Sequence, residues 1–532
     1  MDMNTTTYCL QILATILAFL IAYFTIRYIR SHNNNGSKKR NGKTKVPEIP
    51  GGLPIIGHLH LLSDKIPYFR TFSDMAEKYG SIFALRLGCH PTIMVSSAEL
   101  AKECLTRKDR VFASRPDTAG GRFMGYNNAI FGLAPYGPYW REIRKIATLE
   151  VLSSYRLEKL KHIRDREVYA LVKDLFSFRN SNGLVRISNL LEHMTFNINV
   201  QMIAGKRFSD EAINEEDSEG WRLRKAIRDA TYLFGVFVFA DAIPWLGWFD
   251  FQGYVGFMKR TAKELDSILH RWMVDHMRKR GDDNDENDSK SENDFLDVLI
   301  SAFEENDEIY GHKKDIVLKA TTLMLVLTGS GSTAMTLTWS LSLLLNHPTA
   351  MNAAKQELDT IVGRHKWVQE SHIKDLKYLQ AIVKETLRLY PPAPLTGIRE
   401  ATEDCYLNGY HVLKGTRLFI NLWKLHRDPK TWSNPNAFEP ERFLNACSGI
   451  DFRGQDFEFI PFSSGRRSCP GMTFGMQVVH LTLARLIQGF DMSTKGGSQV
   501  DMSEGLGVAL PKKNALDILL KPRLPLELYE GL

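Results

Sequence analysis

The chain has 532 residues, of which 44% are apolar, 24% charged and 11% aromatic, so it can bury a large core and is not globally disordered. Its formal net charge is +7, but residues 1–48 alone hold seven Lys or Arg and two acidic residues. The rest of the chain is therefore near neutral, which argues against a nucleic-acid-binding protein.

The first predicted element is an apolar run at residues 8–29, long enough to cross a bilayer as a helix. Positive charge follows the run, and no small-residue cleavage site comes after it, which favours a membrane anchor (residues 1–29) over a cleaved signal peptide. The positive-inside rule puts the N-terminus in the lumen and the rest of the chain in the cytoplasm. A basic tether and a Pro/Gly-rich elbow follow (residues 30–55), and the remaining residues, 56–532, form one domain.

The cysteines carry no C-x-x-C spacing and no pairing pattern. They are Cys9, Cys89, Cys104, Cys405, Cys447 and Cys469. A cytoplasmic domain keeps thiols reduced, so a thiolate ligand is a better expectation than a disulfide framework.

After the elbow, residues 81–88 and 90–97 have the composition of short strands. From about residue 140 the apolar pattern becomes helical for most of the following chain, interrupted by the acidic stretch at residues 280–294, which predicts a solvated loop. The predicted fold class is mainly α with small β-sheets near the two ends of the domain.

The stretch "LTGSGSTAMTLTW" (residues 327–339) contains Gly329-x-Gly331-x-x-Ala334, a dinucleotide-binding fingerprint. That fingerprint needs a second strand that ends in an acidic residue about 20 residues later. Residues 346–362 instead predict a loop and an amphipathic helix, so no bound nicotinamide or flavin is expected. The alternative is one buried helix from about Asp315 to Leu345, whose glycines mark a close approach to the backbone.

Near the C-terminus, Cys469 directly precedes Pro470, and a helical pattern runs on from Gly471. A sulfur at a helix N-terminus is favoured as thiolate and is then a good metal ligand. For a lone cysteine, a buried small hydrophobic side chain is the competing interpretation.

The neighbours of Cys469 decide between these interpretations. Phe462, Gly465, Arg467, Cys469 and Gly471 match the F-x-x-G-x-R-x-C-x-G haem-binding loop of the cytochrome P-450 monooxygenases, which the whole globular part resembles. The resemblance implies the cytochrome P-450 fold, and heme b with the Cys469 thiolate as its axial metal ligand.

Other motifs of this family stand in the same order. Glu385 and Arg388 match E-x-x-R, and Arg442 belongs to a P-E-R-F motif; the resemblance implies that the three form a buried charge network. Taken alone, E-x-x-R is a common surface ion pair.

Three further residues are implied to bind the haem. Trp140 and Arg144 match the W-x-x-x-R helix that meets a haem propionate, and Arg399 falls where the family has another propionate partner.

By the same resemblance, the glycine-containing helix crosses above the haem, with Gly329 close to the bound oxygen. Thr328 fills the first position of the family pattern, Gly331 replaces the usual acid, and Ser332 replaces the usual threonine, followed by Thr333. Ser332, Gly329 and Thr333 are therefore the catalytic candidates, with protons relayed by a hydroxyl and ordered water. A serine that bonds back to a helix carbonyl is the competing interpretation.

The implied chemistry is hydroxylation with O2, in which the thiolate pushes electron density toward iron and favours O–O cleavage. Electrons from NADPH would come through a membrane-bound NADPH-cytochrome reductase, which docks against basic residues such as Arg141 and Lys145. The expected location is the endoplasmic reticulum membrane, with a single span and a cytoplasmic catalytic domain.

The expected substrate contacts are apolar, which predicts a small hydrophobic substrate. They are residues 120–133, residues 232–249, Leu395, Thr396 and residues 504–510, with ordinary core packing as the alternative for Phe234, Phe237 and Phe239. The chain resembles the plant branch with nicotine demethylases, flavone and alkaloid hydroxylases and terpenoid oxidases. A terpenoid or flavonoid is favoured over an alkaloid. An oxygen-independent haem-thiolate isomerase or dehydratase and a non-catalytic haem carrier are the alternatives.

Overall fold

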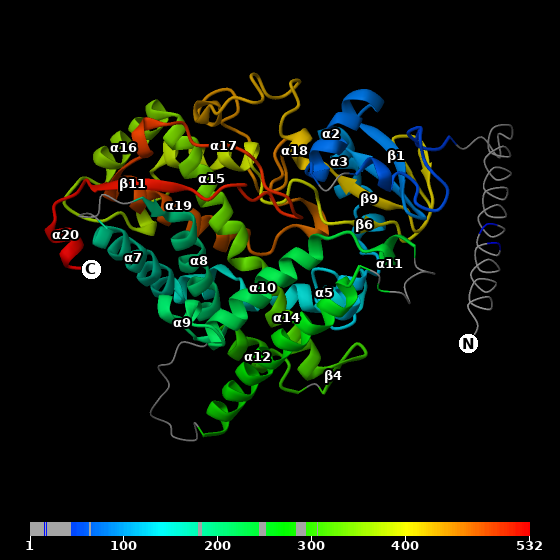
Figure 1. The fold of residues 1–532 in the computed structure, drawn as a ribbon, viewed down its shortest axis with the longest axis horizontal. Coiled ribbons are helices and arrows are strands. Elements are labelled where there is room, and N and C mark those ends of the chain that lie inside the picture. The colour runs from blue at the N-terminus through cyan, green and yellow to red at the C-terminus, as the bar shows by residue number, and fades with distance from the viewer. Residues whose placement is uncertain are drawn as a thin grey trace, which may run out of the picture.

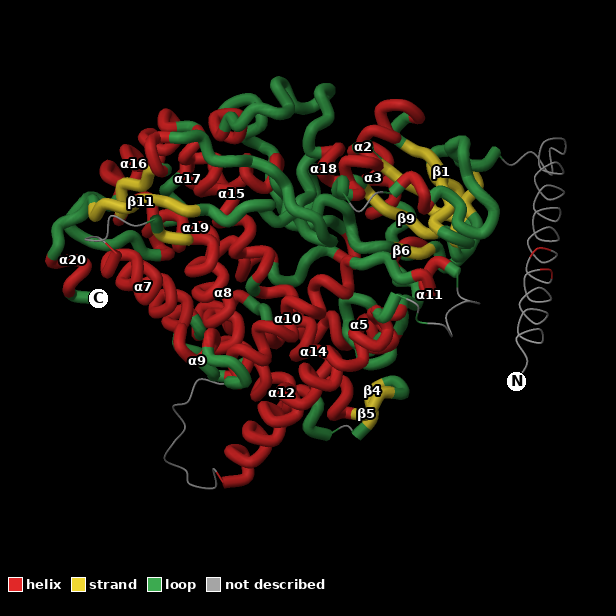
Figure 2. The backbone as a smooth tube through the Cα atoms, viewed as in Figure 1, coloured by secondary structure: helices red, strands yellow, loops and turns green. Residues whose placement is uncertain are grey.

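The computed structural model describes residues 44–62, 65–178, 184–243, 250, 252–282, 294–305 and 307–532, together with residues 15 and 18. The predicted membrane anchor and most of the tether lie outside the described residues. Helices fill the body of the protein, and the strands lie at its margins (Figures 1 and 2). The prediction of a mainly α protein with small sheets is confirmed.

The larger sheet lies beside α2 (Tyr68–Tyr79) and has the order β1-β2-β9-β6. Its first two strands, β1 (Ile82–Leu87) and β2 (His90–Val95), pair antiparallel and confirm the two predicted strands. β9 (Arg417–Ile420) runs parallel to β2, and β6 (Arg399–Glu400) closes the sheet. This long-range pairing brings Arg399 back to the N-terminal part of the chain.

The remaining strands form three small sheets. These are β10 (Phe490–Ser493) with β11 (Asp517–Pro522) and β3 (Val185–Arg186), the pair β4 (Glu308–Ile309) and β5 (His312–Lys313), and the pair β7 (Cys405–Leu407) and β8 (Tyr410–Val412).

The predicted central helix exists, but it is broken once. α14 (Lys314–Gly329) and α15 (Gly331–Asn346) meet at Ser330, which carries φ −96° and ψ −51°. Residues 314–346 are the one stretch of the described chain that is long and apolar enough to span a membrane. Since 61% of that apolar window is buried inside the protein, the stretch is a core helix here.

The helices that pack against α15 include α8 (Ile187–Ala204), α17 (Lys377–Leu389) and α19 (Met472–Gly489), and α8 also contacts α14. Other helices of the domain are α4 (Ala119–Phe123), α5 (Pro138–Ile146), α6 (Ser154–Lys159), α9 (Asp210–Asn214), α10 (Glu219–Gly235), α12 (Tyr254–Asp282) and α13 (Phe295–Ala302).

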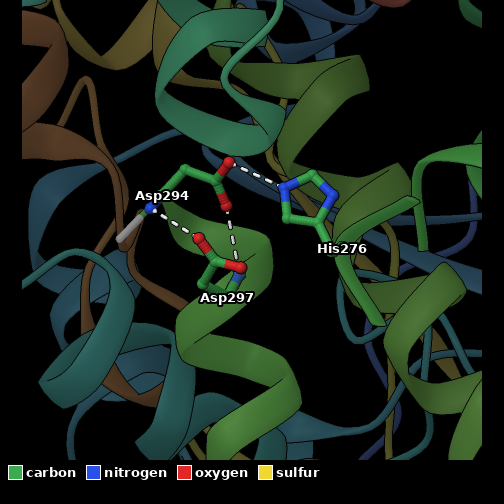
Figure 3. A group of neighbouring side chains, drawn as sticks. All are labelled: His276, Asp294 and Asp297. Atoms are coloured by element: carbon green, nitrogen blue, oxygen red, sulfur yellow. Dashed lines mark hydrogen bonds and ion pairs between the residues drawn. The ribbon is translucent and has the colours of Figure 1, made fainter. Parts of the chain in front are cut away.

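α12 and α13 flank the predicted acidic loop, of which residues 283–293 lie outside the described part. Asp294 caps α13, and its side chain and that of Asp297 exchange hydrogen bonds with each other's backbone N–H (Figure 3). His276 of α12 lies 2.8 Å from Asp294 through Nε2 and 2.7 Å from the Trp272 carbonyl through Nδ1. A carbonyl and a carboxylate can only accept, so this geometry suits a doubly protonated, cationic ring.

Candidate active site

The loop around Cys469 is held by its own backbone and by a tight approach to the chain near residue 105. The Cys469 N–H donates to the Phe462 carbonyl over 2.9 Å. Gly465 has φ +69°, and a Cβ there would lie 2.6 Å from the Leu105 carbonyl oxygen. Glycine is therefore required at position 465 on both conformational and steric grounds. The predicted helix after the cysteine begins at Met472.

The protein environment of the Cys469 sulfur does not by itself produce a thiolate. The side chain keeps accessible surface although protein atoms crowd it. This crowding raises the pKa of Cys469, while the Gly471 N–H and the Arg144 guanidinium lower it, and the balance is a raised pKa. The expected contribution of the helix start is therefore outweighed, and a bound metal cation is what would deprotonate this thiol.

α5 presents two faces to its surroundings. Trp140 and Arg144, one turn apart, face the cysteine loop: the Arg467 Cζ lies 4.4 Å from the Trp140 ring centroid, and Arg144 Nη2 lies 3.4 Å from the Ser468 Oγ. On the adjacent face, Arg141 and Lys145 are exposed to solvent. The helix thus carries the predicted haem partners inward and the predicted docking residues outward.

Four arginines gather at the same place: Arg115, Arg144, Arg399 and Arg467. Burial, followed by repulsion from the other three, lowers the pKa of Arg467, and burial and Arg399 lower that of Arg115. A buried guanidinium stays charged and needs an anion nearby. Within the described residues the one carboxylate in an ion pair with this group is Asp109, 3.5 Å from Arg399.

Arg399 is the least satisfied member of this arginine cluster. It is 1% exposed, its three hydrogen bonds are 3.4 to 3.5 Å long, and its Nε has no partner among the described residues. A buried donor without an acceptor is costly. The cluster therefore fits a ligand that carries carboxylates, as the haem propionates would.

Arg467, one of the predicted haem-binding residues, also makes three hydrogen bonds within the protein. Its guanidinium donates to the carbonyl oxygens of Ala113 (2.7 Å), Phe131 (3.1 Å) and Ala134. These bonds fasten the cysteine loop to residues 113–134. Arg467 adds charge to the cluster, but its hydrogen bonds serve the fold.

Sequence reasoning missed Arg115 and Asp109. Arg115 donates to the Gly132 carbonyl over 3.2 Å and also to the carbonyls of Gly397 and Ile398. Asp109 is 3% exposed and accepts from the Arg466 backbone and side chain, both at 2.9 Å. Neither residue lies in a periodic pattern, and the only local signal was the proline that follows Arg115.

Glu385 of α17 is the centre of a buried ionic network. It accepts two hydrogen bonds from Arg388 (2.7 and 2.8 Å) and one from Arg442 (3.0 Å), and these three residues are at most 6% exposed. Arg388 also donates to the carbonyls of His426, Pro435 and Ala437. The network ties α17 to the segment that leads into the cysteine loop.

The central helix has an accessible face at the break. Thr328 is exposed and Ser332 half-buried, whereas Thr333 is buried with its Oγ1 3.9 Å from the Cβ position of Gly475 on α19. The Ser332 hydroxyl donates to the Thr328 carbonyl over 3.2 Å, which is the back-bonded state that competes with a catalytic one. Thr333 thus does not join the face that Thr328 and Ser332 share.

The two glycines of this helix differ. A Cβ at Gly329 would lie 2.1 Å from the Asn199 Oδ1 of α8, so a neighbouring side chain accounts for that glycine, and Asn199 carried no signal in the sequence. A Cβ at Gly331 would meet only the Met335 Cε, at 4.0 Å. The protein therefore has room for a side chain where the usual acid is missing.

Three of the predicted substrate stretches converge. A Cβ at Gly120 of α4 would lie 2.9 Å from the Phe234 Cδ1, and one at Gly235 would lie 3.1 Å from the Val508 backbone nitrogen. Phe237 and Phe239 are half-buried, with ring centroids 5.7 Å apart. Residues 244–249 of this region lie outside the described part.

The two remaining substrate candidates behave differently. Leu395 is half-buried against the apolar cluster that contains Leu510. Thr396 is 5% exposed and its hydroxyl accepts from the Ile420 N–H over 3.0 Å, so it serves the sheet.

The chain is similar to known proteins over most of its length. The family model described as Cytochrome P-450 matches residues 47–517. Dimethylnonatriene synthase of Arabidopsis thaliana is 48% identical over 91% of this chain and 92% of its own length. Xanthotoxin 5-hydroxylase CYP82C2 of Arabidopsis thaliana (47% identical) and nicotine N-demethylase CYP82E4 of Nicotiana tabacum (46%) each match over 92% of this chain and 95% of their own length. A solved zebra fish structure with progesterone has a TM-score of 0.72 and 25% identity, over 86% of this chain and all of that one.

Proposed function

The chain belongs to the cytochrome P-450 family, and from this premise we propose that it is a membrane-anchored enzyme that hydroxylates a hydrophobic plant specialised metabolite. The family uses haem with a cysteine thiolate ligand, O2 and electrons from a reductase. The observation that carries the proposal is the Cys469 loop, placed beside a buried cluster of four arginines for which Asp109 is the one carboxylate partner among the described residues.

In this proposal Cys469 would supply the thiolate ligand of the haem iron, and Arg399, Arg115, Arg144 and Trp140 would hold the haem propionates. Bound there, the haem supplies oxygen activation. The Arg399 Nε, which has no acceptor among the described protein groups, would gain one, and two carboxylates would offset the repulsion among the arginines. Glu385, Arg388 and Arg442 keep the segment behind the loop rigid.

Proton delivery falls to the hydroxyls of the central helix. Ser332 and Thr328 share the accessible face, and the side-chain-free Gly331 leaves space beside them for ordered water. Ser332 can exchange its bond to the Thr328 carbonyl for a bond to water, so it is the favoured proton carrier. Thr333 faces α19 and would act by packing.

The stretches predicted to contact the substrate are mostly apolar, as binding of a hydrophobic molecule requires. The relatives are named for dimethylnonatriene, nicotine and xanthotoxin, so related sites serve chemically different small molecules. A terpenoid or flavonoid is placed ahead of an alkaloid, because the converging stretches offer half-buried phenylalanines and few charges.

Attachment to the endoplasmic reticulum membrane is part of the proposal. The chain next to the predicted anchor exposes Leu53, Ile55, Leu61 and Ile66, which are 37 to 50% accessible. Apolar side chains grouped near such an anchor would contact lipid. A cytoplasmic catalytic domain then meets the reductase, with Arg141 and Lys145 exposed on α5.

The test uses microsomes that contain the full chain and an NADPH-cytochrome reductase, supplied with a panel of plant terpenoids, flavonoids and alkaloids. The expected result is a normal reduced carbon monoxide spectrum and a product heavier by one oxygen atom, both lost in Cys469→Ser. Product formed without consumption of NADPH or O2 would favour the isomerase or dehydratase. The absence of the usual acid at Gly331 is consistent with that alternative. A normal spectrum with no product from any compound would favour a haem carrier.

A further inference from the structure

One buried amide from a neighbouring helix covers the break in the central helix. Asn199 of α8 is 4% exposed, and its Nδ2 lies 3.1 Å from the carbonyl oxygens of both Leu325 and Val326. In a regular helix these carbonyls accept from the N–H groups of residues 329 and 330, where α14 ends. A side chain inserted at such carbonyls is a known cause of helix kinks.

Asn199 and Gly329 fit each other as a pair. The ideal Cβ position of Gly329 lies 2.1 Å from the Asn199 Oδ1 and 2.7 Å from its Cγ. No side chain at position 329 can coexist with this amide, and the amide reaches the helix because position 329 has none. The contact is specific in chemistry as well as shape, since both donated bonds go to backbone oxygens.

The hydroxyls of the accessible face flank this pair. Thr328 directly precedes Gly329, and Ser332 follows the break at Ser330. Both keep accessible surface in a helix that is mostly buried. The direction of each hydroxyl follows from the backbone angles at the break, and the Asn199 amide bonds two carbonyls of the turn that precedes it.

We propose that Asn199 is a positioning residue, which fixes the break between α14 and α15 and thereby aims the Thr328 and Ser332 hydroxyls for proton delivery. This inference rests on the proposed monooxygenase function. Because Gly331 offers no carboxylate, delivery depends on hydroxyl geometry alone. When it fails, two electrons from NADPH and two protons reduce O2 to hydrogen peroxide, and no oxygen atom reaches the substrate.

The first test compares Asn199→Asp with Asn197→Asp in microsomes with reductase. Aspartate has nearly the size of asparagine, but its carboxylate cannot donate to the Leu325 and Val326 carbonyls and places acceptor oxygens against them. Asn197 is the matched control, because it is fully buried on the same helix but bonds the backbone of Phe208, at 2.9 and 3.1 Å. We expect Asn199→Asp to raise the fraction of NADPH electrons recovered as peroxide about threefold, with a normal carbon monoxide spectrum. The control should leave this fraction unchanged. An unchanged fraction in Asn199→Asp would overturn the proposal.

The second test needs no turnover and no spectrum. Thermal midpoints are measured for Gly329→Ala, for Asn199→Ala and for the double variant of the full chain. Gly329→Ala should lower the midpoint in the native background, where its methyl meets the amide, and should not lower it in the Asn199→Ala background. Equal losses in both backgrounds would overturn the pairing. If the native protein consumed no NADPH, the proposed function would fail, and this cycle would still decide whether Asn199 and Gly329 are coupled.

Discussion

The two glycines of the cysteine loop, Gly465 and Gly471, differ in how the surrounding protein explains them. Gly465 is fixed by the protein itself, through a positive φ and the Leu105 carbonyl, whereas a Cβ at Gly471 would meet no protein atom within 4 Å. The family motif contains both glycines, but only one of them is explained by the chain's own atoms.

We therefore expect different results from the two alanine variants. Gly465→Ala puts a Cβ on a residue with a left-handed conformation, at a cost of about 1 to 2 kcal/mol, and adds an overlap with a backbone oxygen, so the yield of folded protein should fall sharply. Gly471→Ala should fold normally. Circular dichroism and expression yield check both variants. Normal folding of Gly465→Ala would contradict the steric argument.

The Glu385 network gives a second prediction. Glu385→Gln leaves Arg388 buried without its charge partner and leaves Arg442 paired with Glu439 alone, which costs about 3 to 5 kcal/mol. The matched control is Glu158→Gln, since Glu158 pairs with Lys161 at the same i,i+3 spacing but is 69% exposed. We expect the control to change the free energy of unfolding by less than about 0.5 kcal/mol. Chemical denaturation measures the free energy of unfolding of both variants. Similar losses in the two variants would contradict the argument that burial makes the Glu385 pairs important.

Contacts between residues distant in the sequence explain what the sequence could not predict at this scale. Cys469, Glu385, Arg388, Arg442, Trp140 and Arg144 stand in recognisable motifs. Arg115 and Asp109 reach the site through loops, and Asn199 touches the central helix from a helix more than a hundred residues earlier in the chain. No local pattern encodes such approaches, because periodicity reports which face of an element is buried and not what lies against it.

At the scale of elements, we expect the stability of the α12–α13 junction to depend on pH. Burial alone would lower the pKa of His276, but its hydrogen bond to Asp294 and the two nearby carboxylates raise it on balance above its usual value. A raised folded-state pKa stabilises the fold below the ordinary histidine pKa, and this contribution disappears as pH rises through the raised value.

The thermal midpoint of His276→Gln should thus lie below that of the native protein by about 2 °C near pH 6, and the gap should shrink toward pH 9. His270→Gln, an exposed site on the same helix, should show no such dependence. A gap that widened with pH would contradict the cationic ring.

The central helix shows how far element prediction reached. Its extent was predicted to within one residue at each end, because a long apolar run is a strong signal. The break at Ser330 was not predicted, since it depends on an amide from α8.

At the scale of the whole molecule, α5 separates an inner face, which contacts the cysteine loop and is proposed to meet the haem, from an outer basic face. Arg141→Glu with Lys145→Glu should slow the first electron transfer from the reductase roughly tenfold, and the difference should shrink at high salt. Lys263→Glu with Lys279→Glu, exposed on α12, is the charge-matched control. Stopped-flow reduction under carbon monoxide measures both. Equal rates in the two double variants would locate the docking surface elsewhere.

The buried arginine cluster has a consequence for how the protein accumulates in a cell. Four like charges held around one loop, with Asp109 as their one carboxylate partner among the described residues, are expected to destabilise the folded chain until an anionic ligand binds. The supply of haem would then set the abundance of this protein, because chains made when haem is scarce would be degraded quickly by proteases.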